Sequence, residues 1–150
     1  MAVTGRTERW ASERGAELIE FAIVVPLLIV MLAAIFDFGN MFRSFEAVTN
    51  AAREGARVGV LPGYADADVQ SRVDAYMNAA GLTGPYTVAV ANVQVTTAAN
   101  TFAARQVVVN YTYQPIILAP ALALFGGTFG AVPLQAASVM RTEAQAAPGP

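Results

Sequence analysis

The chain has 150 residues, enough for one domain or for a membrane anchor followed by a small domain. Only 13% of the residues are charged, against about a quarter in a typical soluble domain, and 55% are hydrophobic, so part of the chain is expected in or on a membrane. The net charge of -2 provides no basic surface for a nucleic-acid partner. Because the sequence has no Cys and no His, disulfides, thiolate chemistry, imidazole catalysis and most zinc sites are excluded.

The N-terminal part begins with a polar leader, residues 1–15, and continues as a predicted transmembrane helix, residues 16–42. Residues 21–36 carry no charge, and with the flanking apolar residues the segment exceeds the roughly 20 residues that a spanning helix needs. Pro26 can bend such a helix within lipid without ending it. A cleaved signal peptide is the alternative, but the apolar run is long for that role and its pattern continues without a break.

The helical pattern continues beyond the membrane segment as an amphipathic helix. Over residues 41–60 apolar or small residues recur at a spacing of three and four, so the helix is predicted to run from Ala16 to about Val60. A Leu-Pro-Gly sequence then ends it. On its polar side Glu54 and Arg57 are three residues apart and are placed to pair along the helix.

The following residues are predicted to complete a small α+β domain. A second helix is expected from Asp66 to Ala80, with Asp66 and Asp68 in its first turn and Gly81 just past its end. After Gly84 the period changes to two, which predicts an antiparallel sheet of about three strands. The expected strands are residues 86–96 (as one or two strands), 104–113 and 132–142, with a turn at 98–101 and with Leu134, Ala136, Ser138 and Met140 on one face of the last strand.

Residues 115–131 are apolar and uncharged over their whole length. A second membrane span is disfavoured, because the most hydrophobic part, residues 116–125, is too short for lipid and contains Pro120. We expect instead a loop or short helix that lies on the bilayer or is buried against a partner subunit. A simple core segment is the remaining alternative.

Several motifs together resemble a known family. GAELIEF, residues 15–21, resembles the processing site of type IV prepilins. FDFGNMF, residues 36–42, and TNAAREGAR, residues 49–57, are similar to the TadE-like proteins of the tight-adherence (Flp) pilus system. VNYTYQP, residues 109–115, and ASVMRTE, residues 137–143, are similar to the C-terminal part of that family.

The prepilin resemblance implies that a membrane-embedded aspartic peptidase cuts after Gly15. Ala16 would then become the N-terminus and Glu20 the fifth mature residue. A residue without a side chain suits an extended backbone that enters a peptidase cleft. Glu20 is expected to pair with the amino group made at Ala16, within one helix or in another subunit. The alternative is an interfacial acid that merely tolerates its place.

The orientation follows from charge. Three arginines precede the apolar segment, so the leader is expected in the cytoplasm and residues 43–150 outside. Asp37 lies 17 residues after Glu20, about 25 Å along a helix axis, and is expected at the opposite interface as a cap on the membrane segment.

The resemblance implies a minor pilin or pilus-assembly protein of the TadE type, anchored in the cell membrane, with a surface filament as the alternative location. Its partners would be the membrane, a prepilin peptidase, other pilin or TadE-like subunits and the tight-adherence assembly machinery. No catalytic residue, metal site or cofactor is expected. The alternative function is a membrane-tethered binding or sensor module outside the cytoplasm.

Overall fold

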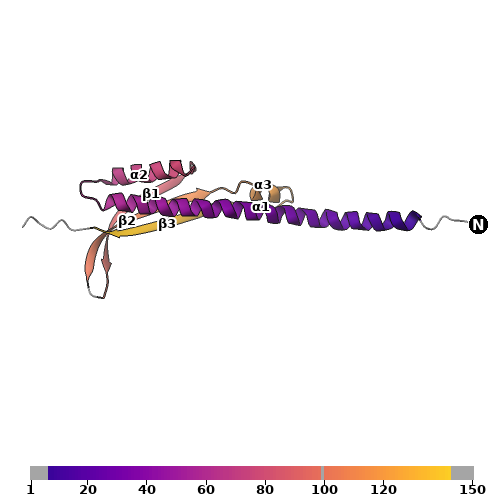
Figure 1. Cartoon of the computed structure of the whole chain (residues 1–150), viewed down its shortest axis with the longest axis horizontal. Helices are drawn as coiled ribbons and strands as arrows, with labels where there is room; N and C mark the ends of the chain where they lie inside the picture. The colour runs from indigo at the N-terminus through magenta and orange to yellow at the C-terminus, as the bar shows by residue number, and fades with distance from the viewer. Residues whose placement is uncertain (1–6, 99, 143–150) are drawn as a thin grey trace, which may run out of the picture. The chain divides into compact units, whose positions relative to one another are not determined.

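The computed structural model describes residues 7–98 and 100–142, and for residues 7–14 it describes the backbone only. These described residues form three helices and three strands in a mixed order, which confirms the predicted α+β class (Figure 1). In chain order the elements are α1 (Thr7–Gly59), α2 (Asp66–Ala79), β1 (Tyr86–Thr96), β2 (Thr101–Tyr113), α3 (Leu118–Ala123) and β3 (Val132–Arg141).

Helix α1 is one continuous helix of 53 residues with Pro26 inside it. Its end at Gly59 lies within one residue of the prediction, but its start at Thr7 is nine residues earlier than the predicted Ala16. The reason is local: the residues from Thr7 to Arg14 include no proline or glycine, so nothing in them interrupts a helix. Most of the expected leader is therefore helical in backbone.

The chain divides into two compact units. The first consists of Met1–Phe38 and Pro115–Phe129, and the second of Gly39–Gln114 and Gly130–Pro150. Helix α1 contributes to both, since its first part belongs to the first unit and its part from Gly39 onward to the second.

In the second unit, α1 and α2 pack on one face of a three-stranded antiparallel sheet in the order β1-β2-β3. The register places Val88 opposite Val109, and Val109 opposite Ala136, so these three residues share a face. The core between helices and sheet consists of Val48, Ala51, Ala52, Ala56, Val69, Val73, Met77, Leu82, Val107, Val109 and Ala136. These residues alternate along the strands and recur at helical spacing in α1 and α2, which is why the sequence pattern predicted both kinds of element.

The ends of α2 follow the predicted signals. The backbone amide of Ala65 donates to the Asp68 carboxylate at 2.8 Å, and Asp68 lies in the first turn. Gly81 follows the helix with φ of +74°, a conformation that favours glycine. The predicted helix 66–80 is thus confirmed within one residue.

The strands also agree with the prediction, with small differences at their ends. β1 is a single strand with the predicted bounds. β2 begins at Thr101, three residues before the expected Ala104, because the turn is shorter than expected and Thr96 pairs directly with Thr101. On β3, Leu134 and Ala136 are buried on the predicted face.

Candidate functional site

The first unit is organised around a buried carboxylate, that of Asp37 on α1. Its side chain is only 3% exposed. Its Oδ1 accepts a hydrogen bond from the backbone amide of Ile116 at 3.0 Å. Its Oδ2 accepts from the amides of Ile117 at 3.0 Å and Leu118 at 2.5 Å. The carboxylate therefore caps the N-terminal end of α3, whose amides have no partner within so short a helix.

The carboxylate thus caps α3, where the sequence predicted a cap on the membrane segment itself, while the expected position of Asp37 at a membrane interface stays a prediction. The residue lies inside the first unit and holds a segment about eighty positions further along the chain. An ionised carboxylate that accepts several backbone amides is well satisfied without water, which explains how it tolerates burial.

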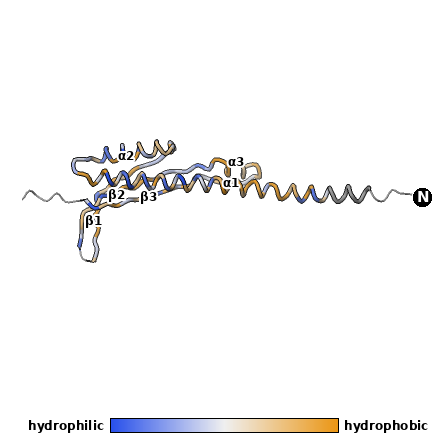
Figure 2. The backbone as a smooth tube through the Cα atoms, in the orientation of Figure 1, coloured by the Kyte–Doolittle hydropathy of each residue, from blue (hydrophilic) through white to orange (hydrophobic). Residues whose placement is uncertain are grey.

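Helix α3 packs on the apolar part of α1. Leu118 and Ala121 are buried against Ala33, in contact with Val30 and neighbouring residues. Figure 2 shows apolar colours along α3 and along the α1 segment beside it. The prediction of a short helix within residues 115–131 is confirmed, and its buried side contacts the chain's own helix.

The other side of this segment is exposed and apolar. Ile116 is 63% exposed and Leu124 81%. Among the described residues, α1 is the one helix long and apolar enough to cross a membrane, by length and composition, over Gly15–Gly59. Its large apolar side chains, such as Leu27 at 70% exposure, are likewise uncovered. An aqueous surface rarely presents so much contiguous apolar area, which favours lipid or protein as its environment.

The proposed processing residues lie in helical backbone near the start of α1. Gly15 and Ala16 are within α1, and a Cβ added at Gly15 would meet no atom within 4 Å. Glu20 is exposed on the same helix, four residues after Ala16 and therefore on the same face. The structure thus brings Ala16 and Glu20 together along α1, while it places Asp37 in a separate arrangement.

The motif TNAAREGAR forms a close-packed seam in the second unit. Its small residues Ala51, Ala52 and Ala56 are at most 1% exposed. A Cβ added at Gly55 would lie 2.7 Å from Cγ2 of Val73, so only glycine lets α2 approach at this point. The small residues of the motif therefore set the distance between α1 and α2.

The charged residues of the same motif lie outside the seam. Glu54 pairs with Arg72 of α2 at 2.9 Å, so the expected pairing with Arg57 on the same helix is wrong. Arg72 pairs with Glu54 in place of Arg57 because the close packing of α2 on α1 brings the Arg72 guanidinium within reach. Further along the sheet Arg105 of β2 binds Asp66, and it donates to Asn92 at 3.0 Å.

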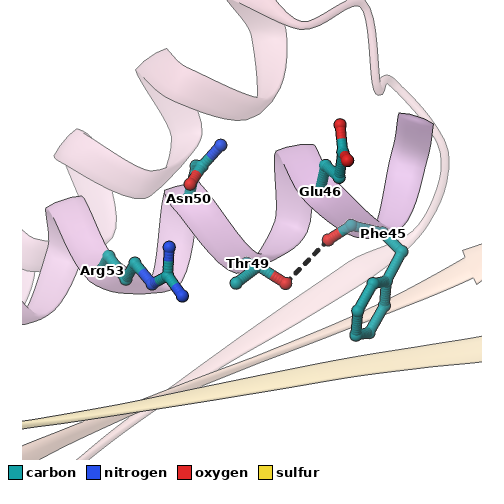
Figure 3. A pocket seen from close by; sticks show the side chains of 5 residues that line it. All are labelled: Phe45, Glu46, Thr49, Asn50 and Arg53. Carbon is teal, nitrogen blue, oxygen red and sulfur yellow. Dashed lines mark hydrogen bonds between the residues drawn. The ribbon is translucent and has the colours of Figure 1, made fainter. Parts of the chain in front are cut away.

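A shallow cavity of about 310 Å³ lies on the polar side of α1 in the second unit. Figure 3 shows its lining side chains, which come from successive turns of the helix. They are Phe45, Glu46, Thr49, Asn50 and Arg53. Thr49 donates its hydroxyl to the Phe45 carbonyl at 2.8 Å, so this group is engaged within the helix. In the part of the chain that the structure describes, no three His, Cys, Asp or Glu residues are grouped to hold a metal ion.

A family model described as TadE-like protein matches residues 15–57. The matched segment begins at the proposed processing glycine and ends with the TNAAREGAR seam. It supports a TadE-like protein over this segment, whereas residues 109–115 and 137–143 lie outside the match. A search of curated proteins and a search of solved structures each found no significant match.

Proposed function

We propose that this chain is a membrane-anchored structural protein of a tight-adherence (Flp) pilus system, a minor pilin or pilus-assembly protein of the TadE type. The observation that carries the proposal is the match of residues 15–57 to the TadE-like family. The same segment contains a helix long and apolar enough to serve as the anchor. In this proposal the protein acts by helix-to-helix assembly and performs no catalysis.

Processing would remove residues 1–15, so that the mature anchor begins at Ala16. The Gly15–Ala16 bond lies within helix α1, and a peptidase must unwind the backbone there before it can cut. A glycine inside a helix is about 0.5–1 kcal/mol less stable than an alanine, so Gly15 lowers the cost of that opening. This adds a second reason for glycine to the absence of a side chain next to the scissile bond.

Glu20 would pair with the new amino group of Ala16, in the same chain or in a neighbouring subunit. Its exposure on α1 leaves the carboxylate available to a partner. An unpaired charged side chain at the bilayer centre costs about 2.5–3.5 kcal/mol on insertion scales. Pairing of the ammonium with the carboxylate lowers the cost of placing both charges near a membrane interface. The domain that follows the anchor would then lie outside the cytoplasm.

The processing step is tested by mass spectrometry of the full-length protein in cells with and without a prepilin peptidase. We expect an N-terminus at Ala16 only when the peptidase is present. Gly15→Ala should leave the leader attached. A chain that keeps residues 2–15 in the presence of the peptidase would contradict processing and favour a membrane-tethered binding or sensor module.

The assembly role is tested separately with Glu20→Ala. This variant should be inserted and cleaved normally, but less of it should be recovered in sheared surface filaments or in complexes with other pilus subunits. Glu17→Ala is a matched control, because Glu17 is an exposed acid on the same helix at a position that does not pair with Ala16 in this proposal. Equal recovery of the two variants and the wild type would refute the pairing role.

A further inference from the structure

The uncharged part of α1 is too short to cross a bilayer by itself. Residues 21–36 number 16, which is about 24 Å of helix at about 1.5 Å per residue. The hydrocarbon core of a bilayer is about 30 Å thick. Asp37 ends the uncharged run, and an ionised carboxylate facing lipid at this depth would be costly.

The loop that contains α3 removes this difficulty. It covers Asp37, whose carboxylate is 3% exposed and accepts the backbone amides of residues 116–118. The next charged residue along α1 is Arg43, which donates to the Ala80 carbonyl at 3.2 Å. With Asp37 covered, residues 21–42 present no charge outward. These 22 residues correspond to about 33 Å of helix, which matches a bilayer.

The depth of α3 follows from its contacts. It packs on Val30, Ala33 and Ala34, which lie inside the apolar run of α1 and precede Asp37 by three to seven residues. At about 1.5 Å per residue, the contacts of α3 lie roughly 5–10 Å from Asp37 along the helix axis, on the N-terminal side and therefore within the apolar run. If α1 spans the membrane, α3 therefore lies at the depth of the acyl chains.

The surface that α3 and its flanking loops present is suited to that depth. No charged residue occurs in the segment. Its exposed large side chains are apolar and continue the lipid-facing surface of α1. They are Ile116, Ile117, Leu124, Phe125 and Phe129.

The backbone of the segment is also paired at both ends of α3, as a non-aqueous environment requires. Asp37 satisfies the amides at the start of the helix. At its end the Leu122 carbonyl accepts from the amides of Phe125 and Gly127, and the Ala123 carbonyl accepts from Gly126. Gly126 has φ of +75°, the left-handed conformation that allows such a compact helix end.

We propose that residues 115–129 are embedded in the outer leaflet of the bilayer beside α1, in contact with lipid acyl chains, and that this segment completes the membrane span by covering Asp37. The inference rests on the proposed anchoring of α1 in the membrane. Lipid is favoured over a protein partner because the segment has no charged group and its exposed large side chains are all apolar, with the Thr128 hydroxyl as an exposed polar group beside them.

The test uses the full chain in lipid nanodiscs, at one copy per disc, with a single environment-sensitive fluorophore on an introduced cysteine. The native sequence has no cysteine, so no background variant is needed. Leu124→Cys reports on the loop, and because Leu124 is 81% exposed, the substitution removes few packing contacts. Phe125→Cys is a second reporter. Leu27→Cys on α1 is the lipid-facing control, and Ser71→Cys on α2 is the exposed control outside the membrane.

Nitroxide groups on the acyl chains should quench the Leu124→Cys label to within about twofold of the Leu27→Cys label, and a water-soluble quencher should reach only the Ser71→Cys label. A Leu124→Cys label that is quenched from water like Ser71→Cys refutes the embedded loop while leaving the anchor intact. Protection of the Leu124→Cys and Phe125→Cys labels from both quenchers indicates protein contact and also refutes the proposal. A Leu27→Cys label that is not quenched from lipid refutes the membrane anchor itself.

Discussion

Removal of the Asp37 carboxylate should release the α3 segment from α1. In Asp37→Ala the amides of Ile116, Ile117 and Leu118 lose the acceptor that the structure gives them. A hydrogen bond to a charged group contributes about 1.5–3 kcal/mol, so three of them contribute about 6 kcal/mol if they act independently. Opening of the segment in the wild type also lets water reach the carboxylate, which returns about 3 kcal/mol of the cost of removing it from water, and the alanine variant lacks this term.

The net loss is therefore about 3 kcal/mol, which corresponds to an increase of roughly 100-fold in the equilibrium constant for local opening. Hydrogen–deuterium exchange of the full chain in nanodiscs measures this directly, because a peptide that spans residues 115–121 contains all three amides. We expect its exchange to become about 100-fold faster, whereas peptides from the core strand β2 should not change.

Two further variants separate the hydrogen bonds from the charge. Asp37→Asn keeps one acceptor oxygen and should give an intermediate rate. Glu46→Ala removes an exposed acid from the same helix and should leave the segment unaffected. If Asp37→Ala exchanges within about threefold of the wild type, the carboxylate does not hold the segment and the account of the first unit is wrong.

Three other variants test the second unit. Gly55→Ala should lower the unfolding temperature by several degrees, because a Cβ 2.7 Å from Val73 overpacks the core and costs about 1–3 kcal/mol of stability. Gly39→Ala is the control, since a Cβ there would meet no atom within 4 Å, and it should not lower the unfolding temperature. Equal effects of the two variants would contradict the close packing at Gly55. The Tyr86 hydroxyl donates to the Asp74 carboxylate at 2.8 Å. This hydrogen bond raises the pKa of Tyr86, with smaller contributions from burial and from the nearby charge of Asp74. The contribution of Tyr86 to the free energy of unfolding is therefore full below about pH 10 and is lost as the pH rises through the pKa of the folded state. Urea unfolding should show a loss of up to about 1 kcal/mol in Tyr86→Phe at pH 8 and a difference that becomes smaller as the pH rises above about 10. A difference that does not vary with pH would refute this role. Glu54→Ala should lower the free energy of unfolding by less than about 1 kcal/mol, because the Glu54 and Arg72 side chains are both partly exposed. The double variant with Arg72→Ala should lose no more stability than the larger of the two single changes.

The periodic elements could be predicted from the sequence because their causes are local. Alternation predicted the bounds of β1 and the buried face of β3, and Gly81 marked the end of α2. The start of α1 differs from the prediction because a polar sequence without helix-breaking residues was interpreted as a leader that precedes the helix. Polar residues avoid a core, but they can extend an existing helix, because adding a residue to a helix costs far less than starting one.

The contacts of Asp37 and Glu54 could not be predicted, because each depends on a partner brought close by packing. Nothing near Asp37 in the sequence indicates amides some eighty residues away. The signal in the sequence was the apolar segment 115–131, which has no charge and is too short to span a membrane. Such a segment has to pack against another part of the chain or a partner. Glu54 had a cation three residues away, but the glycine at position 55 brought α2 and Arg72 within reach instead.

The composition of α1 changes along its length, and this change restricts where partner helices can bind. From Phe21 to Phe36 the exposed residues of α1 are mostly large and apolar, while from Ala47 to Gly59 small residues pack against the chain's own α2 and sheet. Between them Ser44 donates its hydroxyl to the Asn40 carbonyl at 2.9 Å, so this group is engaged within the helix. The seam face of α1 is therefore already occupied, and assembly through helix contacts is expected to use the segment before Asp37. Substitutions that weaken assembly without unfolding the second unit should accordingly fall among exposed residues such as Ile23 and Leu27, and they should leave the unfolding temperature unchanged.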